Sequence, residues 1–412
     1  MRSAMVWLLL ALAALLLAAC VRVAVHGDAP APTSMPAPTQ GALRIATYNA
    51  SLNSDEAGGL MQRLQGEDDD ARKVAAVLQQ VRPDIVLINE FDYVADGSAA
   101  DLFQRRWLER PQAGGGDALH YPYRYLAPVN TGVQSGLDLD NNGTVGGTGR
   151  DRGNDAWGYG LHPGQYGMLL LSRYPIDAAA ARTFQLLKWS TMPDATRPRD
   201  PATGAYFHSD AVWSQLRLSS KSHWDVPVRT PQGVLHVLAS HPTPPAFDGP
   251  ERRNVARNRD EIHFWNAYLA PAGHENWLCD DAGTCGGLAA DARFVILGDL
   301  NNDPVDGSGD HSVITELLEH PRVLRMTTPR SDGAVEAAAA EGGANAAHRG
   351  AAAHDTGSFG PRVGNLRIDY VLPSVGQRVT GNGVFWPPSG SPQAAIVDGT
   401  DHRLVWVDVL RD

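Results

Sequence analysis

Short apolar runs rich in Val, Ile and Leu recur along the chain and are separated by turn-forming residues. Runs of this length and composition predict buried β-strands. They cover residues 43–49, 84–90, 165–176, 234–242, 293–303, 365–373 and 403–409. Several of them end in a polar side chain, namely Asn49, Glu90, His241 and Asp299. Because polar groups at strand ends avoid the core, we expect these side chains to lie on a rim of the β structure.

Helical periodicity is found between some of these runs. Residues 55–82 carry apolar residues at helical spacing from Val74 to Val81, and Pro83 ends the predicted helix. A second helix is predicted after residue 251. Its arginines could form an anion-binding face, but the interspersed acidic residues favour a solvated, salt-bridged surface. The residues concerned are Arg252, Arg253, Arg257 and Arg259, with Glu251, Asp260 and Glu261.

Two stretches depart from the alternation of strands and helices. Residues 110–165 are Gly-rich and polar and too long for a simple connection, so we expect a functional insertion. Residues 331–360 are rich in Ala and Gly with few apolar anchors, and they predict a mobile loop.

The first insertion contains a segment similar to the first half of a calcium-binding loop. Oxygen side chains occupy alternate positions, and a Gly follows for the sharp turn. The closing position, where such loops carry a bidentate Glu, is Gly149, so Asp151 or Asp155 would have to replace it. A structural Ca²⁺ and a plain Asx-rich turn both remain open. The alternating side chains are Asp138, Asp140 and Asn142.

The N-terminus has the features of an export signal. A short positive region precedes an uninterrupted apolar run over residues 6–19, and the residues before Cys20 resemble the lipobox of bacterial lipoproteins. The resemblance implies a signal peptide over residues 1–19, a lipidated Cys20, and attachment to the cell envelope at the outer membrane or cell surface. Residues 20–41 are rich in Pro and Ala and predict an extended tether. An ordinary signal peptide cleaved nearby is the alternative.

Composition limits the interactions of the folded part. The chain has 412 residues, and 35 basic against 46 acidic side chains give a formal net charge of -11. The global field therefore does not favour non-specific binding to nucleic acid, and an anionic substrate would need local attraction by a metal or by Arg. Cys279 and Cys285 are close enough in the sequence to close a small loop, so we expect a disulfide.

The run at residues 293–303 carries the strongest candidate for chemistry. Asp299 provides a carboxylate that can activate water, and Asn301 provides an amide that can donate to an anionic oxygen, a pairing that suits phosphoester hydrolysis. Taken alone, the pair is more simply explained by an Asp-Asn turn after a core strand, and the other motifs of the chain favour the catalytic interpretation.

Further candidate groups follow other strands. His241 could donate to a phosphoryl or leaving-group oxygen, although an isolated His is often structural. Asp369 lies within an apolar run, where a buried carboxylate needs a partner such as His. Asp401 and His402 stand at the entry of the last strand.

In this order, these motifs resemble the endonuclease/exonuclease/phosphatase superfamily, which includes DNase I-like nucleases. The resemblance covers approximately residues 43–410, within a catalytic domain at 42–412 that carries the two insertions. It implies an α+β fold, a four-layer αββα sandwich of two packed, mostly antiparallel sheets flanked by helices. It also implies an active site on one rim. The motifs contain Asn49, Glu90, Ser240, His241, Asp299, Asn301, Asp369, Asp401 and His402.

The resemblance also implies roles for these residues. Glu90 would bind a divalent metal, Mg²⁺ with Mn²⁺ as the alternative, together with Asn49 and Asp401. Asp299 would position or deprotonate the attacking water, and Asn301 would hydrogen-bond the phosphoryl oxygen. The remaining residues, which would serve as acid, base or phosphate clamp, are His241, Asp369 and His402.

The expected function is an exported, metal-dependent phosphoester hydrolase, most directly a phosphodiesterase or nuclease. A phosphomonoesterase and a phospholipid-type phosphodiesterase are alternatives that would use the same site. The alternative from another class is a catalytically inactive, surface-anchored binding protein. Nucleic acid, a phospholipid headgroup and a small phosphorylated metabolite all remain open as substrates, and no protein partner is implied.

Overall fold

A computed structural model describes residues 35–270 and 276–412 of the chain. The predicted signal peptide, Cys20 and most of the predicted tether lie outside the described residues. Two β-sheets form the centre of the fold, with six strands in the order β12-β13-β1-β2-β4-β3 and five in the order β11-β8-β7-β6-β5. A separate two-stranded sheet consists of β9 and β10.

The first sheet contains β1 (Leu43–Leu52), β2 (Ile85–Phe91), β3 (Tyr123–Tyr125), β4 (Met168–Ser172), β12 (Gln377–Val384) and β13 (Val405–Arg411). The second contains β5 (Arg182–Thr183), β6 (His223–Thr230), β7 (Gly233–Ser240), β8 (Phe294–Asp299) and β11 (Asp369–Pro373). The small sheet pairs β9 (Gly357–Ser358) with β10 (Asn365–Leu366).

The helices are α2 (Gly59–Gln65), α3 (Asp69–Val81), α4 (Ser98–Phe103), α5 (Gly149–Asn154), α6 (Asp210–Trp213), α7 (Arg253–Tyr268), α8 (His311–Glu319) and α9 (Asp332–Glu341). Short 3₁₀ or π segments are η1 (Gln104–Leu108), η2 (Trp189–Thr191), η3 (Gly343–Ala347), η4 (Ala352–His354) and η5 (Pro392–Ile396). Within the described ranges, no helix has the length and apolar character needed to span a membrane.

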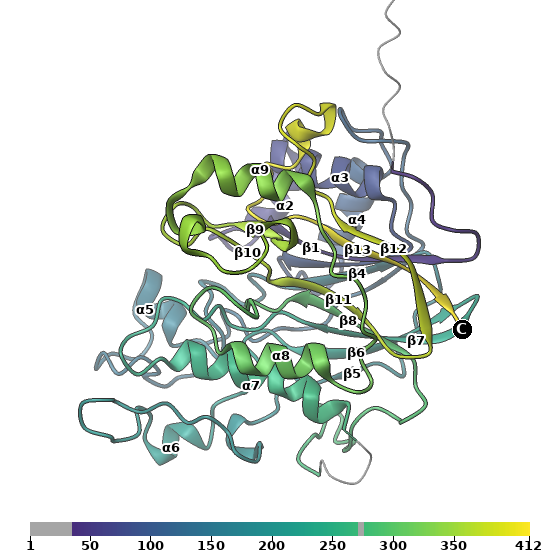
Figure 1. Cartoon of the computed structure of the whole chain (residues 1–412). Helices are drawn as coiled ribbons and strands as arrows, with labels where there is room; N and C mark the ends of the chain where they lie inside the picture. Colours follow the sequence, from purple (N-terminus) through teal and green to yellow (C-terminus); the bar gives the residue numbers. More distant parts are fainter. Residues whose placement is uncertain (1–34, 271–275) are drawn as a thin grey trace, which may run out of the picture. The chain divides into compact units, whose positions relative to one another are not determined.

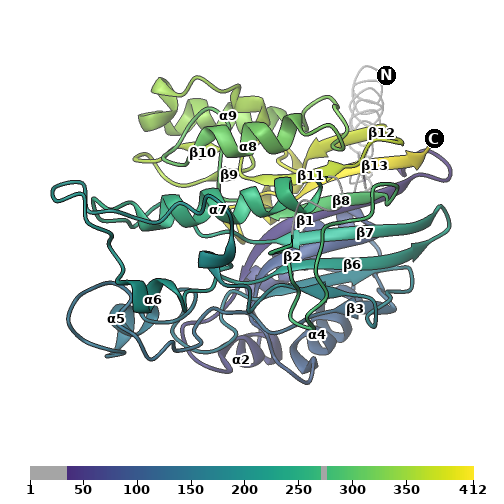
Figure 2. The same cartoon turned by 90° about the horizontal axis from the view of Figure 1, so that it is seen from below.

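Alternation along the strands sorts the core into layers. Ile45 and Val237 pack between the two sheets, whereas their chain neighbours Ala46 and Leu238 face the helices on either side. Helices α2, α3 and α4 cover the outer face of the first sheet, and α7 and α8 cover that of the second (Figure 1). Figure 2 shows β6, β7 and β8 side by side in the second sheet. The predicted four-layer αββα sandwich is confirmed.

Strand direction brings the polar strand ends together. β1 and β2 are parallel, as are β7 and β8, while most other pairs are antiparallel. In the second sheet, Asp299 at the end of β8 pairs directly with Asp369 at the start of β11. The backbone N–H of Asp299 donates to Oδ1 of Asn89 on β2 at 3.2 Å, which joins the carboxyl ends of β8 and β2 across the sandwich.

The two insertions differ in structure. Residues 110–165 contain β3 and α5 and otherwise consist of turns and loops. Residues 331–360, by contrast, were expected to form a mobile loop, and this is wrong because they contain helix α9. The side chain of Ser331 accepts a hydrogen bond from the backbone N–H of Ala334, which caps the helix. The Ala residues that provide few apolar anchors are also the strongest helix formers.

The structure joins Cys279 and Cys285 in a disulfide, with a sequence separation of 6 residues. Asp280, inside this loop, accepts hydrogen bonds from the backbone N–H groups of Ala282 and Thr284. Its other carboxylate oxygen pairs with Nε of Arg182 at 2.7 Å. The disulfide loop is therefore held against the edge strand β5.

Candidate active site

Eight side chains predicted from the sequence lie at the ends of strands that share one rim of the sandwich. Asn49 and Glu90 come from the parallel strands β1 and β2, and Asp299 ends β8. His241 directly follows β7, whose register places it beside the end of β8. The structure also brings in the four others, Asn301, Asp369, Asp401 and His402, as the contacts below show.

Asn49 connects the metal-binding and water-activating candidates. Its Nδ2 group donates to Oε1 of Glu90 and to Oδ2 of Asp299, each at 3.1 Å. Glu90 also accepts a hydrogen bond from Nδ2 of Asn53 at 2.9 Å. Two carboxylates from different sheets are therefore held by the same amide, so Glu90 and Asp299 belong to a single site.

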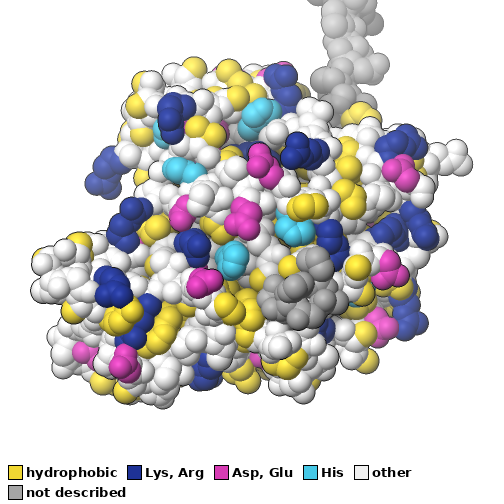
Figure 3. Space-filling model, turned by 60° about the horizontal axis from the view of Figure 1, so that its bottom comes forward, with side chains coloured by type: hydrophobic (Ala, Val, Ile, Leu, Met, Phe, Trp, Pro, Cys, Tyr) yellow, Lys and Arg dark blue, Asp and Glu magenta, His cyan; other side chains and the backbone are white. Residues whose placement is uncertain are grey.

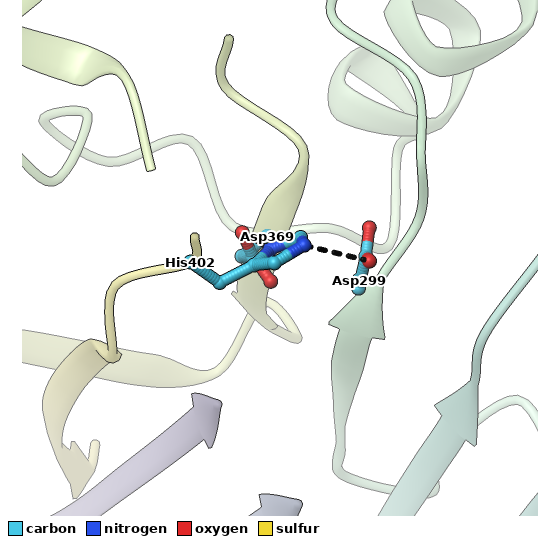
Figure 4. A group of neighbouring side chains, drawn as sticks. All are labelled: Asp299, Asp369 and His402. Carbon is cyan, nitrogen blue, oxygen red and sulfur yellow. Dashed lines mark hydrogen bonds and ion pairs between the residues drawn. The ribbon is translucent and has the colours of Figure 1, made fainter. Parts of the chain in front are cut away.

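His402 lies between two carboxylates (Figure 4). Its Nδ1 atom is 3.0 Å from Oδ2 of Asp369, and its Nε2 atom is 3.6 Å from Oδ2 of Asp299. Burial alone would lower the pKa of His402, but the carboxylates of Asp369 and Asp299 outweigh this effect and raise it. Asp401 is more exposed, and its Oδ1 atom lies 3.8 Å from Nε2 of His402.

A second imidazole contacts the same carboxylate. His241 is buried, with its Nε2 atom 3.4 Å from Oδ2 of Asp299. Burial, with the nearby charges of Lys221 and His402, holds the pKa of His241 well below its usual value. His241 therefore presents a neutral ring, whereas His402 is held in its charged form.

Asn301 secures the carboxylate from its own loop. Its backbone N–H donates to Oδ1 of Asp299 at 2.9 Å, and its Nδ2 group donates to the carbonyl of Pro242 at 3.1 Å. The side-chain amide thus bridges the loops that follow β8 and β7. The acceptor residue, Pro242, directly follows His241 in the chain.

The backbone is strained at this rim. Glu90 and Asn301 both have positive φ angles, 58° and 54°, a conformation that non-Gly residues adopt at a cost of about 1–3 kcal/mol. Gly298 is required for another reason, since a Cβ atom there would lie 2.0 Å from the carbonyl oxygen of Ser240. Strain of this kind is typical of functional sites, where side chains must point away from the regular strand direction.

Sequence reasoning missed Lys221, which lies just before β6. Its side chain is buried near Glu90 and Asp299, and no hydrogen bond or ion pair to it occurs among the described residues. Burial lowers its pKa, while the charges of Glu261, Glu90 and Asp299 act in the opposite direction. A Lys in the polar sequence Ser-Ser-Lys-Ser gives no signal of burial, so only the structure identifies this ammonium.

The expectation that α7 presents a solvated, salt-bridged surface is wrong in part. Asp260 and Glu261 are buried, and the Glu261 carboxylate accepts from the backbone N–H groups of Ser220 and Thr243, each at 2.6 Å. Those residues flank Lys221 and His241. Buried carboxylates on α7 therefore position the loops that carry two site residues, because unpaired backbone N–H groups attract them.

The donor set of the rim fits a divalent cation. Glu90, Asp299, Asp369 and Asp401 bring four carboxylates into one small region, and Asp369 retains a buried oxygen, Oδ1, without a hydrogen-bond partner. Burial raises the pKa of Glu90 and of Asp299, because a charged carboxylate loses solvation there. Carboxylate and amide oxygens are the ligands that Mg²⁺ prefers.

The candidate calcium segment brings three acidic side chains together. Oxygens of Asp138, Asp140 and Asp155 lie within 4.8 Å of one another. Oδ1 of Asn142 accepts from the backbone N–H of Thr144. Asp155 is one of the two residues that could replace the missing Glu, and it lies in this acidic group. The presence of Ca²⁺ stays a prediction.

Comparison with known proteins gives the following similarities. The model of the Endonuclease/Exonuclease/phosphatase family matches residues 46–402. Among solved structures, an endonuclease/exonuclease/phosphatase from Beutenbergia cavernae DSM 12333 has 18% identity and a TM-score of 0.46, with coverage of 90% of this chain and 72% of that one. Sphingomyelinase C from Streptomyces griseocarneus has 16% identity and a TM-score of 0.42, with coverage of 89% and 99%. The human Nocturnin catalytic domain with bound sulfate has 12% identity and a TM-score of 0.41, with coverage of 90% and 94%.

A comparison with curated proteins found no match to this chain. The family match begins within β1 and ends at His402, so it contains all eight rim residues from Asn49 onward. The chain therefore belongs to the endonuclease/exonuclease/phosphatase family.

Proposed function

We propose that this protein is a metal-dependent phosphoester hydrolase that acts primarily as a phosphodiesterase or nuclease. Members of the family hydrolyse phosphoester bonds. The observation that carries the proposal is the environment of Asp299, which shares the Asn49 amide with Glu90 and is contacted by two imidazoles. A structural role for Asp299 would not require this convergence of ionisable groups.

The metal would be held by Glu90 and Asp401, with Asn49 beside them. Mg²⁺ suits these oxygen ligands, and Mn²⁺ is the alternative. When bound, the ion would supply a Lewis acid that offsets negative charge on the phosphoryl group. Glu90 is oriented for this role by amide donors from Asn49 and Asn53.

Asp299 would act as the general base toward water. Its raised pKa makes the carboxylate a better proton acceptor, and the hydrogen bonds from Asn49 and Asn301 fix its orientation. Water attacks phosphorus while its proton moves to Asp299, and the bond to the leaving oxygen breaks on the opposite side.

The remaining groups would stabilise charge on the phosphoryl and leaving oxygens. Asn301 and Lys221 provide neutral and charged donors, respectively. His402 is kept protonated by Asp369 and Asp299, so it is the better proton donor, whereas His241 would contribute a hydrogen bond from a neutral ring. The structure retains every predicted catalytic group, which argues against the alternative of an inactive binding protein.

The export and lipid anchor remain a proposal from the sequence. Residues 1–19 would be removed, Cys20 would carry the lipid, and residues 20–41 would tether the enzyme to the cell envelope. A Cys20→Ser variant should be released from membranes. Retention of this variant in the membrane fraction after processing would reject the lipid anchor.

The proposed activity is tested by hydrolysis of bis-p-nitrophenyl phosphate, measured with Mg²⁺ and then with a chelator. A panel containing DNA, a phospholipid and a phosphomonoester separates the nuclease from its alternatives. We expect Asp299→Ala and His402→Ala to lose about 10³-fold or more in kcat, since both groups act in the transition state. Activity that persists in both variants, or that ignores the chelator, would reject the proposal.

A further inference from the structure

A cavity of about 410 Å³ opens beside the catalytic rim, where it is lined by Glu90, Lys221 and His241. Most of the rest of its wall comes from the insertion at 110–165, from segments near Trp189 and Leu216, from the loop between β7 and α7, and from the start of α7. We call this cavity the insertion pocket. Its size matches sites for small organic ligands.

Two aromatic side chains of the insertion pocket are exposed. Tyr159 is 46% exposed and Phe247 is 74% exposed, although both could lower the free energy of folding by burial. Phe247 also has a φ angle of 60°, which is costly for a bulky residue. Folding explains neither the exposure nor the strain. A ligand with an apolar or planar part would cover both rings.

The insertion pocket also contains two cationic side chains without a partner among the described residues, Lys221 and Arg150. The other two cationic side chains of the wall already have partners. Arg253 pairs with Glu251 at 2.5 Å, and Arg257 donates to backbone carbonyls such as that of Leu218. Among the described residues that line the wall, the only carboxylate is that of Glu90.

This local excess of positive charge contrasts with the formal net charge of -11 for the chain. Figure 3 shows Lys and Arg side chains scattered among acidic and histidine side chains over the face that it presents. The charges in the insertion pocket thus suit a compact anion, whereas that face has no broad basic strip that would track a polymer.

We propose that the insertion pocket binds the organic part of a small phosphoester that carries a planar ring and a second anionic group. This proposal rests on the proposed hydrolysis. Lys221 lies near the catalytic carboxylates and would contact the phosphate that reacts. Tyr159 and Phe247 would pack against the ring. Arg150, which comes from the insertion, would pair with the second anion.

The test uses the full-length chain with Mg²⁺ and measures competitive inhibition of bis-p-nitrophenyl phosphate hydrolysis by three probes. Inorganic phosphate has neither ring nor second anion, thymidine 5′-phosphate adds the ring, and thymidine 3′,5′-bisphosphate adds both. We expect the inhibition constant to fall by about 10-fold or more at each step, as aromatic stacking and an Arg-phosphate pair would provide.

Single substitutions assign each gain to a residue. Phe247→Ala should remove most of the gain from the ring and leave inhibition by inorganic phosphate unchanged. Arg150→Gln should remove only the gain from the second phosphate. Val145→Ala, at another exposed apolar residue of the insertion outside the pocket wall, is the control and should change none of the three constants.

The outcomes distinguish a failure of ligand binding in the insertion pocket from a failure of the proposed hydrolysis. Wild-type protein that does not hydrolyse bis-p-nitrophenyl phosphate would overturn the proposed function. Normal hydrolysis with three equal inhibition constants, or with gains that survive both substitutions, would overturn the insertion pocket as a substrate site. Tighter inhibition by long DNA than by the bisphosphate, unaffected by either substitution, would favour a polymer bound elsewhere on the surface and would also overturn it.

Discussion

Nδ1 of His402 lies 3.0 Å from Oδ2 of Asp369, and this pair sits directly beside Asp299 because Asp369 and Asp299 are register partners on β11 and β8. The hydroxyl of Thr356 donates to the same Asp369 oxygen at 2.7 Å. The carboxylate therefore has a fixed orientation, and it sets both the direction and the charge of the imidazole.

The Asp369→Asn substitution should lower kcat by about 100-fold, because the neutral amide can neither hold His402 in its charged form nor fix its orientation. The measurement is steady-state hydrolysis of bis-p-nitrophenyl phosphate. Asp225→Asn is the matched control. Asp225 pairs with Nδ1 of His236 at 2.7 Å on the same sheet but outside the rim, so this variant should keep its kcat. Equal losses in both variants would indicate a stability effect only.

Gly298→Ala should destabilise the protein by about 3 kcal/mol, because the new Cβ would lie 2.0 Å from the Ser240 carbonyl oxygen and force β7 and β8 apart. The free energy of unfolding in urea measures this effect. Gly390→Ala is the control, since nothing lies within 4 Å of a Cβ built there, and it should have a negligible effect. A stable Gly298→Ala protein would mean that the rim can relax around the added methyl group.

The stability of the fold should fall in acid because of His223. Burial lowers the pKa of His223 to about 3, and the ring is neutral, with Nε2 donating to the Glu261 carbonyl at 2.8 Å and Nδ1 accepting from the Ser219 hydroxyl. The unfolded chain takes up this proton near pH 6.5, so stability present above that pH is lost as the pH falls toward 3.

The effect of the His223→Phe substitution on the unfolding free energy isolates the contribution of His223 protonation. The difference in unfolding free energy between wild type and variant should be about 2 kcal/mol smaller at about pH 5 than at about pH 8, since only the wild type gains a proton on unfolding. Urea unfolding at the two pH values measures it. A penalty that does not depend on pH would show that His223 is protonated equally in both states.

Calcium should raise the thermal stability if the cluster of Asp138, Asp140 and Asp155 holds the ion. At about 10 mM Ca²⁺, a site of the affinity usual in extracellular modules would add about 1–3 kcal/mol to the unfolding free energy. Differential scanning calorimetry measures the shift in Tm. The Asp140→Asn variant should lose this shift, and a wild-type Tm that ignores Ca²⁺ would leave the segment as an Asx-rich turn.

Sequence patterns predicted which side chains lie together where a residue ends a strand. Asn49, Glu90, His241 and Asp299 each follow an apolar run, and parallel neighbours necessarily present such ends on one rim. Asp369 was predicted by a related argument, since a carboxylate in an apolar run requires a buried partner.

The features that the sequence did not predict depend mainly on contacts between segments that are distant in the chain. Lys221 enters the site because Glu261 of α7 binds the loop around it, and nothing near Lys221 in the sequence reports that contact. Asp155 joins the acidic cluster only because the insertion folds back on itself. Helix α9 was missed because the search for apolar periodicity gives little weight to Ala, whose helix propensity and Ser331 cap stabilise the segment.

The proposed function requires that the rim formed by Glu90, Asp299 and their neighbours is one metal-dependent hydrolytic site. Calorimetric titration with Mg²⁺, run in parallel with hydrolysis of bis-p-nitrophenyl phosphate, tests it most directly in wild type and Glu90→Gln. We expect Glu90→Gln to weaken Mg²⁺ binding by about 10-fold or more and to lower hydrolysis at sub-saturating Mg²⁺ to the same degree. A Glu90→Gln protein that binds Mg²⁺ and hydrolyses the substrate like wild type would contradict it.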